Sequence, residues 1–140
     1  MLRQVILAIL TTSAMSCGVV GLGGGSPNVL APTNATSLAQ GAFTGVVTGK
    51  TVAGNAIVYS VNGAPGSYIL RLQSLTAPSE AGIQAVVSST SGIAQTVVLS
   101  AFSGNYNYTF SAANNLIFVG GQVTIHSTAN NQDYGQALLQ

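Results

Sequence analysis

Charged residues are almost absent from this sequence: they make up 4% of its 140 residues, as three Lys or Arg and two Asp or Glu. Ordinary soluble proteins carry about a quarter charged residues. Removal of the first 16 residues would leave two positive and two negative side chains, and no net charge with His126 neutral. Because nucleic-acid binding needs several Lys or Arg to neutralise phosphates, nucleic acid is excluded as a partner.

Cysteine occurs once, at Cys17, so no disulfide can form within the chain. Long hydrophobic runs are also missing. The unbroken apolar stretch over residues 5–10 is far too short for a membrane-spanning helix, which requires about 20 such residues. Arg3 precedes this stretch and small residues follow it, which is the order of an export signal. We therefore predict a signal peptide over residues 1–16.

The cysteine stands at the end of that signal. Residues 13–17, Ser-Ala-Met-Ser-Cys, resemble a bacterial lipobox. The resemblance implies cleavage before Cys17, a diacylglycerol on its thiol and a further acyl chain on its amine, which together make a durable membrane anchor. Gly18 stands where an inner-membrane retention signal has Asp, which favours the outer membrane of a bacterial cell envelope, facing the periplasm or the surface. The alternatives are a small buried Cys17 or plain cleavage near Ala14.

The segment after the cysteine is rich in Gly, Pro, Ser, Thr and Asn, with neither helical nor strand periodicity. This composition is typical of a flexible tether. We therefore expect a tether over residues 17–40, which begins with the lipidated Cys17, and one domain over residues 41–140.

From Gly41 onward, short alternating or β-branched segments are separated by Gly, Pro and Asn. Turn residues, such as those at 62–66 and 103–105, recur at the spacing of an antiparallel sandwich. We predict an all-β fold, an antiparallel β-sandwich of about eight strands with little helix. The expected strands cover residues 43–48, 56–61, 67–75, 83–88, 95–102, 106–110, 122–127 and 134–139. The expected core comprises Leu70, Leu72, Val86, Val98, Phe102, Phe110, Val123, Ile125 and Leu139.

The domain resembles the DM13 family, also called the electron-transfer DM13 domain. The resemblance rests on the opening at residues 41–54, the stretch YILRLQSL at 68–75, GNYNY at 104–108, and QVTIHSTANNQDYGQALL at 122–139. In this register Ser127 stands where the family commonly has its Cys, and His126 where it has Trp. The family's proposed redox role depends on that thiol, and a serine cannot supply it. The resemblance therefore leaves one redox alternative, an accessory electron-transfer lipoprotein that acts through a bound cofactor.

Other chemistry has few candidate residues. His126 and Ser127 are neighbours on a predicted strand, so their side chains point to opposite faces and cannot form a dyad. His126 is either a surface imidazole beside Thr124 on the polar face of its strand, or it pairs with Asp133 and with a Ser or Thr on an adjacent strand. Glu80 and Asp133 are the only carboxylates, and a weak calcium site around residues 130–133 is the most that they offer a metal. We expect no enzyme activity, no catalytic residue, no cofactor and no metal.

The tyrosines offer a possible binding surface. Tyr106 and Tyr108 lie two residues apart and share one face of a predicted strand. They form either an exposed platform for a sugar or a partner protein, to which His126 would add from its own strand, or part of the buried core. The low charge removes repulsion between sheets and edges. We therefore expect a non-enzymatic module for binding or assembly, whose partner is an unidentified protein or glycan, or a second copy of the chain.

Overall fold

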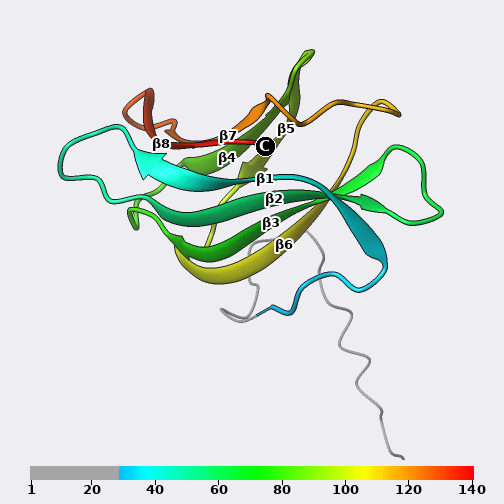
Figure 1. Cartoon of the computed structure of the whole chain (residues 1–140). Helices are drawn as coiled ribbons and strands as arrows, with labels where there is room; N and C mark the ends of the chain where they lie inside the picture. Colours follow the sequence, from blue (N-terminus) through cyan, green and yellow to red (C-terminus); the bar gives the residue numbers. More distant parts are fainter. Residues whose placement is uncertain (1–28) are drawn as a thin grey trace, which may run out of the picture.

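The structure is a computed structural model, and it describes residues 29–140 (Figure 1). The predicted signal peptide, Cys17 and the first part of the predicted tether lie outside the described residues. Residues 29–140 contain no helix long and apolar enough to cross a membrane. The eight strands are β1 (Ala35–Gly45), β2 (Ala53–Val61), β3 (Ser67–Thr76), β4 (Ile83–Ser89), β5 (Gly92–Val98), β6 (Ser103–Ser111), β7 (Gln122–Ser127) and β8 (Gln132–Leu138).

All neighbouring strands are antiparallel, in the order β5-β4-β7-β8-β1-β2-β3-β6. β1 belongs to both layers, because residues 35–42 pair with β2 and residues 43–45 pair with β8. Figure 1 shows β2, β3 and β6 on one side of β1, with β8, β7, β4 and β5 on the other. The sheet therefore folds over along β1 into an antiparallel sandwich, which confirms the predicted fold class.

Gly41 lies at the point where β1 changes partner. A Cβ atom at this position would lie 2.1 Å from the backbone oxygen of Leu138. Just beside it, Gln40 and Gln140 exchange two backbone hydrogen bonds of 3.1 and 2.9 Å. Only a residue without a side chain allows β1 to pass this close to the end of β8.

The core lies between the two layers and follows the alternation of the strands. Tyr68, Leu70 and Leu72 of β3 point inward, as do Val123 and Ile125 of β7. These residues confirm the faces expected from the sequence. The assignment of two residues to the core is wrong. Val86 lies on the outer face, because Ile83, Ala85 and Val87 are the inward residues of β4, and Val98 is 62% exposed at the end of edge strand β5.

Strand boundaries differ from the expectation at two places. β1 begins at Ala35, inside the segment expected to be tether. Residues 103–105, expected to be a turn, begin β6 instead, and β5 ends at Val98. Gly104, with a φ of 116°, pairs with Leu75 at a register shift between β3 and β6, so this glycine marks a bulge within the sheet.

Candidate functional site

β7 presents two predicted site residues on opposite faces, as its alternation requires. Ser127 is fully buried, whereas His126 is partly exposed on the outer face. The Ser127 hydroxyl accepts a hydrogen bond of 3.3 Å from the backbone N–H of Asn130. Ser127 is thus a core serine whose hydroxyl bonds to the turn that follows β7.

A polar cluster closes one end of the sandwich around Tyr134, which has no exposed surface. The Tyr134 hydroxyl donates a hydrogen bond of 2.9 Å to Glu80 Oε2 and accepts one of 2.6 Å from Asn130 Nδ2. Lys50 forms an ion pair with Glu80, and its Nζ lies 5.2 Å from the centre of the Tyr134 ring. The cluster therefore joins the β1–β2, β3–β4 and β7–β8 connections to the beginning of strand β8.

The electrostatics of this cluster favour a structural function. Hydrogen bonding to the Ser127 hydroxyl, followed by Asn130 and Lys50, lowers the pKa of Tyr134 against the opposing effect of burial. The Tyr134 hydroxyl already has a hydrogen-bond donor and an acceptor, and the ring is sealed from solvent. The cluster therefore holds three loops together. The Tyr134 side chain is not accessible to a ligand. Sequence reasoning missed it, because Glu80 and Tyr134 lie 54 residues apart.

His126 and Asp133 form a second polar pair, on the outer face, with 2.7 Å between Nδ1 and Oδ1. Of the arrangements that the sequence allowed for His126, the structure thus shows the pairing with Asp133 across the β7–β8 connection. No Ser or Thr hydroxyl bonds to His126 among residues 29–140, so no hydrolytic triad is assembled there. No group of three His, Cys, Asp or Glu that could hold a metal ion occurs in that range either.

A shallow groove of about 420 Å³ runs beside this pair across β4, β5, β7 and β8. Apart from His126 and Asp133, its lining side chains are uncharged, and they are Val86, Ser88, Ile93, Gln122 and Thr124. A neighbouring hollow of about 610 Å³ continues along the same face between β1 and β8, and Val46 and Leu138 line it together with Thr and Gln side chains. We name this continuous surface the outer face of the β4–β5–β7–β8 layer.

The outer face combines exposed aliphatic side chains with very little charge, which is limited to the His126–Asp133 pair among the residues that line its two hollows. Ile93, Val98, Leu138 and Val46 are 72, 62, 59 and 51% exposed. No Asp, Glu, Lys or Arg occurs between Glu80 and Asp133, a stretch that contains all of β4, β5, β6 and β7. Large exposed apolar patches with a polar uncharged surround are typical of interaction surfaces. The outer face is therefore the candidate binding surface of the described part of the protein.

Tyr106 and Tyr108 do not contribute to a binding surface. Both point into the core from β6 and are 4% and 8% exposed. Their ring centres lie 6.4 Å apart, and the Tyr106 hydroxyl donates a hydrogen bond to the backbone oxygen of Ser103. Of the two arrangements expected for these tyrosines, the structure thus shows the buried one. The alternative of an exposed aromatic platform is wrong.

Tyr108 carries the one buried side-chain polar atom without a hydrogen-bond partner in the described part of the chain. Burial, with a smaller contribution from Tyr106, raises the pKa of Tyr108 to about 12. Because this value exceeds that of an unfolded tyrosine, near 10, the stabilising effect of the protonated form is complete below pH 10. It is lost as the pH rises from 10 to 12.

Replacing Tyr108 with Phe should therefore leave the stability at neutral pH unchanged or raise it by up to about 1 kcal/mol. Between pH 10 and 12, the Tyr108→Phe variant should lose less stability than the unmodified protein. Urea unfolding at a series of pH values measures both effects. Tyr106→Phe is the matched control, since it removes a satisfied hydroxyl and should cost about 1 kcal/mol at neutral pH. If Tyr108→Phe lost as much stability at neutral pH as this control, the Tyr108 hydroxyl would have to form a hydrogen bond in the folded protein, which contradicts the structure.

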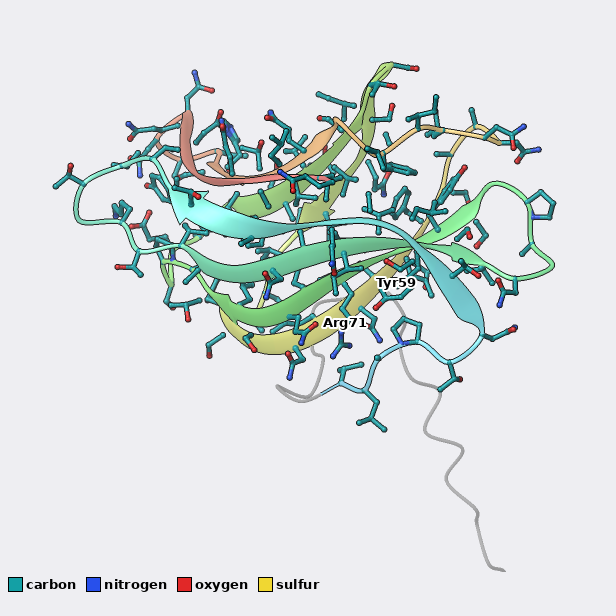
Figure 2. The ribbon with its side chains drawn as sticks, viewed as in Figure 1. Tyr59 and Arg71 are labelled. Atoms are coloured by element: carbon teal, nitrogen blue, oxygen red, sulfur yellow. The ribbon has the colours of Figure 1, made fainter. Side chains whose placement is uncertain are left out.

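The segment over residues 29–34, which we name the N-terminal strap, crosses the outside of the other layer. Arg71 is 6% exposed, and its Nη1 donates hydrogen bonds to the backbone oxygen of Val29 and to Asn107 Oδ1. Asn107 in turn donates to the backbone oxygen of Leu30 at 2.8 Å. Figure 2 shows Arg71 on the side of the sheet where the strap runs. The chain therefore enters the sandwich over β3 and β6, on the layer away from β4 and β5.

Comparison of the chain with protein-family models, with curated proteins and with solved structures found no match.

Proposed function

We propose that this protein is a membrane-anchored, non-enzymatic module that binds or assembles through the outer face of its β4–β5–β7–β8 layer. The observation that carries the proposal is the combination of four strongly exposed aliphatic side chains with a surface on which the His126–Asp133 pair supplies the only titratable lining side chains. The affinity of such a surface comes from apolar burial and from hydrogen bonds of Gln, Ser and Thr. The partner class is therefore an uncharged protein surface or a glycan.

The His126–Asp133 pair fits this proposal as a fixed polar contact. The carboxylate engages Nδ1, so Nε2 is the ring nitrogen available to a partner in the groove. His126 and Asp133 are the only titratable side chains that line the two hollows of the outer face. This face therefore offers a partner one polar pair and no wider patch of charge that would attract or repel it.

The lipid anchor on Cys17 is the second part of the proposal. A fully extended chain from Cys17 to Val29 spans at most about 40 Å. Arg71 and Asn107 hold the strap against β3 and β6, so an anchored protein would present this layer toward the membrane. The outer face of β4 and β5 would then be directed away from the lipid, where a partner can reach it.

The DM13 resemblance supports one alternative, an accessory electron-transfer lipoprotein that acts through a bound cofactor. Ser127 supplies no thiol, and its buried hydroxyl is hydrogen-bonded within the turn at Asn130. Redox activity would therefore have to reside in a group that the chain binds, and such a group adds both mass and an absorption band.

Native mass spectrometry of the protein extracted from its own membrane in mild detergent tests the proposal. We expect acyl mass on a chain that begins at Cys17, and bare polypeptide in multiples of one chain or in a defined complex with a partner. A haem, metal or other cofactor that travels with the chain would contradict the proposal and support the electron-transfer alternative. An unmodified N-terminal segment would contradict the anchor alone.

A further inference from the structure

We propose that two copies of this chain pair along the free edge of β5 and form a two-fold symmetric dimer with one continuous sheet. The proposal rests on the proposed function, because it names a second copy as the partner that covers part of the outer face. The chemistry is antiparallel backbone pairing, completed by aliphatic contacts between side chains on either side of the junction.

The two edges of the sheet differ in how well they are covered. The strand order ends at β5 on one side and at β6 on the other. Along β6, the backbone N–H of Val29 donates to the oxygen of Asn105, and Asn107 holds Leu30, so the N-terminal strap lies over this edge. No strand or strap pairs with the outer side of β5 within residues 29–140. β5 is therefore the edge that can accept another strand.

β5 lacks most features by which proteins protect an edge strand. Such edges are usually short, or carry Lys, Pro or inward-pointing charges. The sequence of β5, GIAQTVV, has neither proline nor a charged residue, and β4 beside it has none either. Its exposed ends, Ile93 and Val98, are the most exposed aliphatic residues of any strand in the described chain. These are the properties of an edge that pairs rather than one that repels.

The register of β5 makes it complementary to itself. Residues 84–88 of β4 oppose five residues of β5, which are Val98, Val97, Thr96, Gln95 and Ile93, with Ala94 left over in a bulge. Ile93, Thr96 and Val98 oppose outward residues of β4, so they share the outer face. The order of outward and inward residues is therefore symmetric about Thr96.

A second β5 in antiparallel orientation, with Thr96 opposite Thr96 of the copy, satisfies this symmetry. If Ala94 is left out of the new pairing as it is from the pairing with β4, Ile93 of each chain lies opposite Val98 of the other on the outer face, and the pair occurs twice. When two identical antiparallel strands pair with the same residue at the centre, a two-fold axis passes through that residue pair. The contact is therefore isologous, and it is complete with two copies. Within residues 29–140, the strap contacts β6 at Asn105 and Asn107 and so obstructs the second edge through which a fibre could grow.

Electrostatics do not oppose the association. The first charged residues before and after β5 in the sequence are Glu80 and Asp133, and Glu80 is held in the cluster with Lys50. The described chain carries two positive and two negative side chains, so two copies approach without net repulsion.

Sedimentation of the full chain in detergent, across a series of concentrations, tests the proposal. We expect a reversible equilibrium between one and two chains, free of larger species. Replacing both Ile93 and Val98 with Lys should weaken the dimer at least about tenfold, because aliphatic pairs are lost and like charges then face each other across the junction. These side chains are largely exposed, so the variant should retain the fold by circular dichroism.

The matched control replaces Val46 and Leu138 with Lys, which adds the same charge to similarly exposed positions of the outer face, away from β5. This control should dimerise as the unmodified protein does. If the control dissociates and the β5 variant does not, the copies meet elsewhere on the outer face. The β5 proposal is then overturned and the proposed function stands. A chain that stays monomeric at every concentration overturns self-pairing, and the native mass of a complex with a different partner then decides the proposed function separately.

Discussion

Replacing Gly41 with Ala should destabilise this protein by about 3 kcal/mol or more, a large effect for a single methyl group. The added Cβ would lie 2.1 Å from the backbone oxygen of Leu138, and neither backbone can give way without breaking the pairing of β1 with β8. The junction between the two layers depends on this contact. Thermal unfolding followed by circular dichroism should show a midpoint lowered by about 4–8 °C for each kcal/mol.

Gly45, at the other end of the same β1–β8 pairing, provides the control. The nearest atom to a Cβ at Gly45 is 3.6 Å away, which is ordinary contact. Gly45→Ala should therefore change stability by no more than about 0.5 kcal/mol. Equal midpoints for the two variants would contradict the close passage of β1 over the end of β8.

Replacing Tyr134 with Phe should cost about 1–3 kcal/mol, because it removes a hydrogen bond to the Glu80 carboxylate and one from Asn130 at a part-buried site. The packing of the ring is retained, so the loss reports on the hydroxyl alone. The three loops that the cluster joins should also exchange their backbone amides faster in hydrogen–deuterium exchange. Urea unfolding gives the stability change.

Tyr59 is half-buried on β2 and lies outside this cluster, so Tyr59→Phe serves as the control and should be nearly neutral. If the Tyr134 variant were as stable as this control, with unchanged exchange in the loops, the hydrogen-bonded cluster would not stabilise the fold. The outer face and the dimer proposal would be unaffected, since both lie elsewhere in the sandwich.

The fold class followed from the sequence because alternation is a local property. Leu70 and Leu72 of β3, and Val123 and Ile125 of β7, could be assigned to one face by counting residues. Which of the two faces of a strand is buried depends on how the sheet folds and not on the local sequence. Val98 is an example. Its strand lies at the sheet edge, where half of the aliphatic residues find no opposing layer.

The polar sites divide in the same way. The pairing of His126 with Asp133 could be offered from the sequence as one arrangement, because seven residues across one hairpin bring the two within reach. The contact of Tyr134 with Glu80 was not, since it depends on the order of the strands in the sheet. The shared face of Tyr106 and Tyr108 was predictable too, but their burial follows from the position of β6 against the opposite layer.

Oxidative cross-linking at Thr96 tests the dimer most directly. In the full chain with Cys17 replaced by Ala, Thr96→Cys supplies the only thiol. In the proposed register the two Thr96 Cα atoms lie about 4.5–5.5 Å apart, within the range that a disulfide can bridge. Thr44→Cys, on the outward side of β1 opposite Gln136, is the control. We expect a covalent dimer from Thr96→Cys on mild oxidation, far in excess of that from Thr44→Cys. Equal and slow cross-linking of the two variants would contradict pairing through β5.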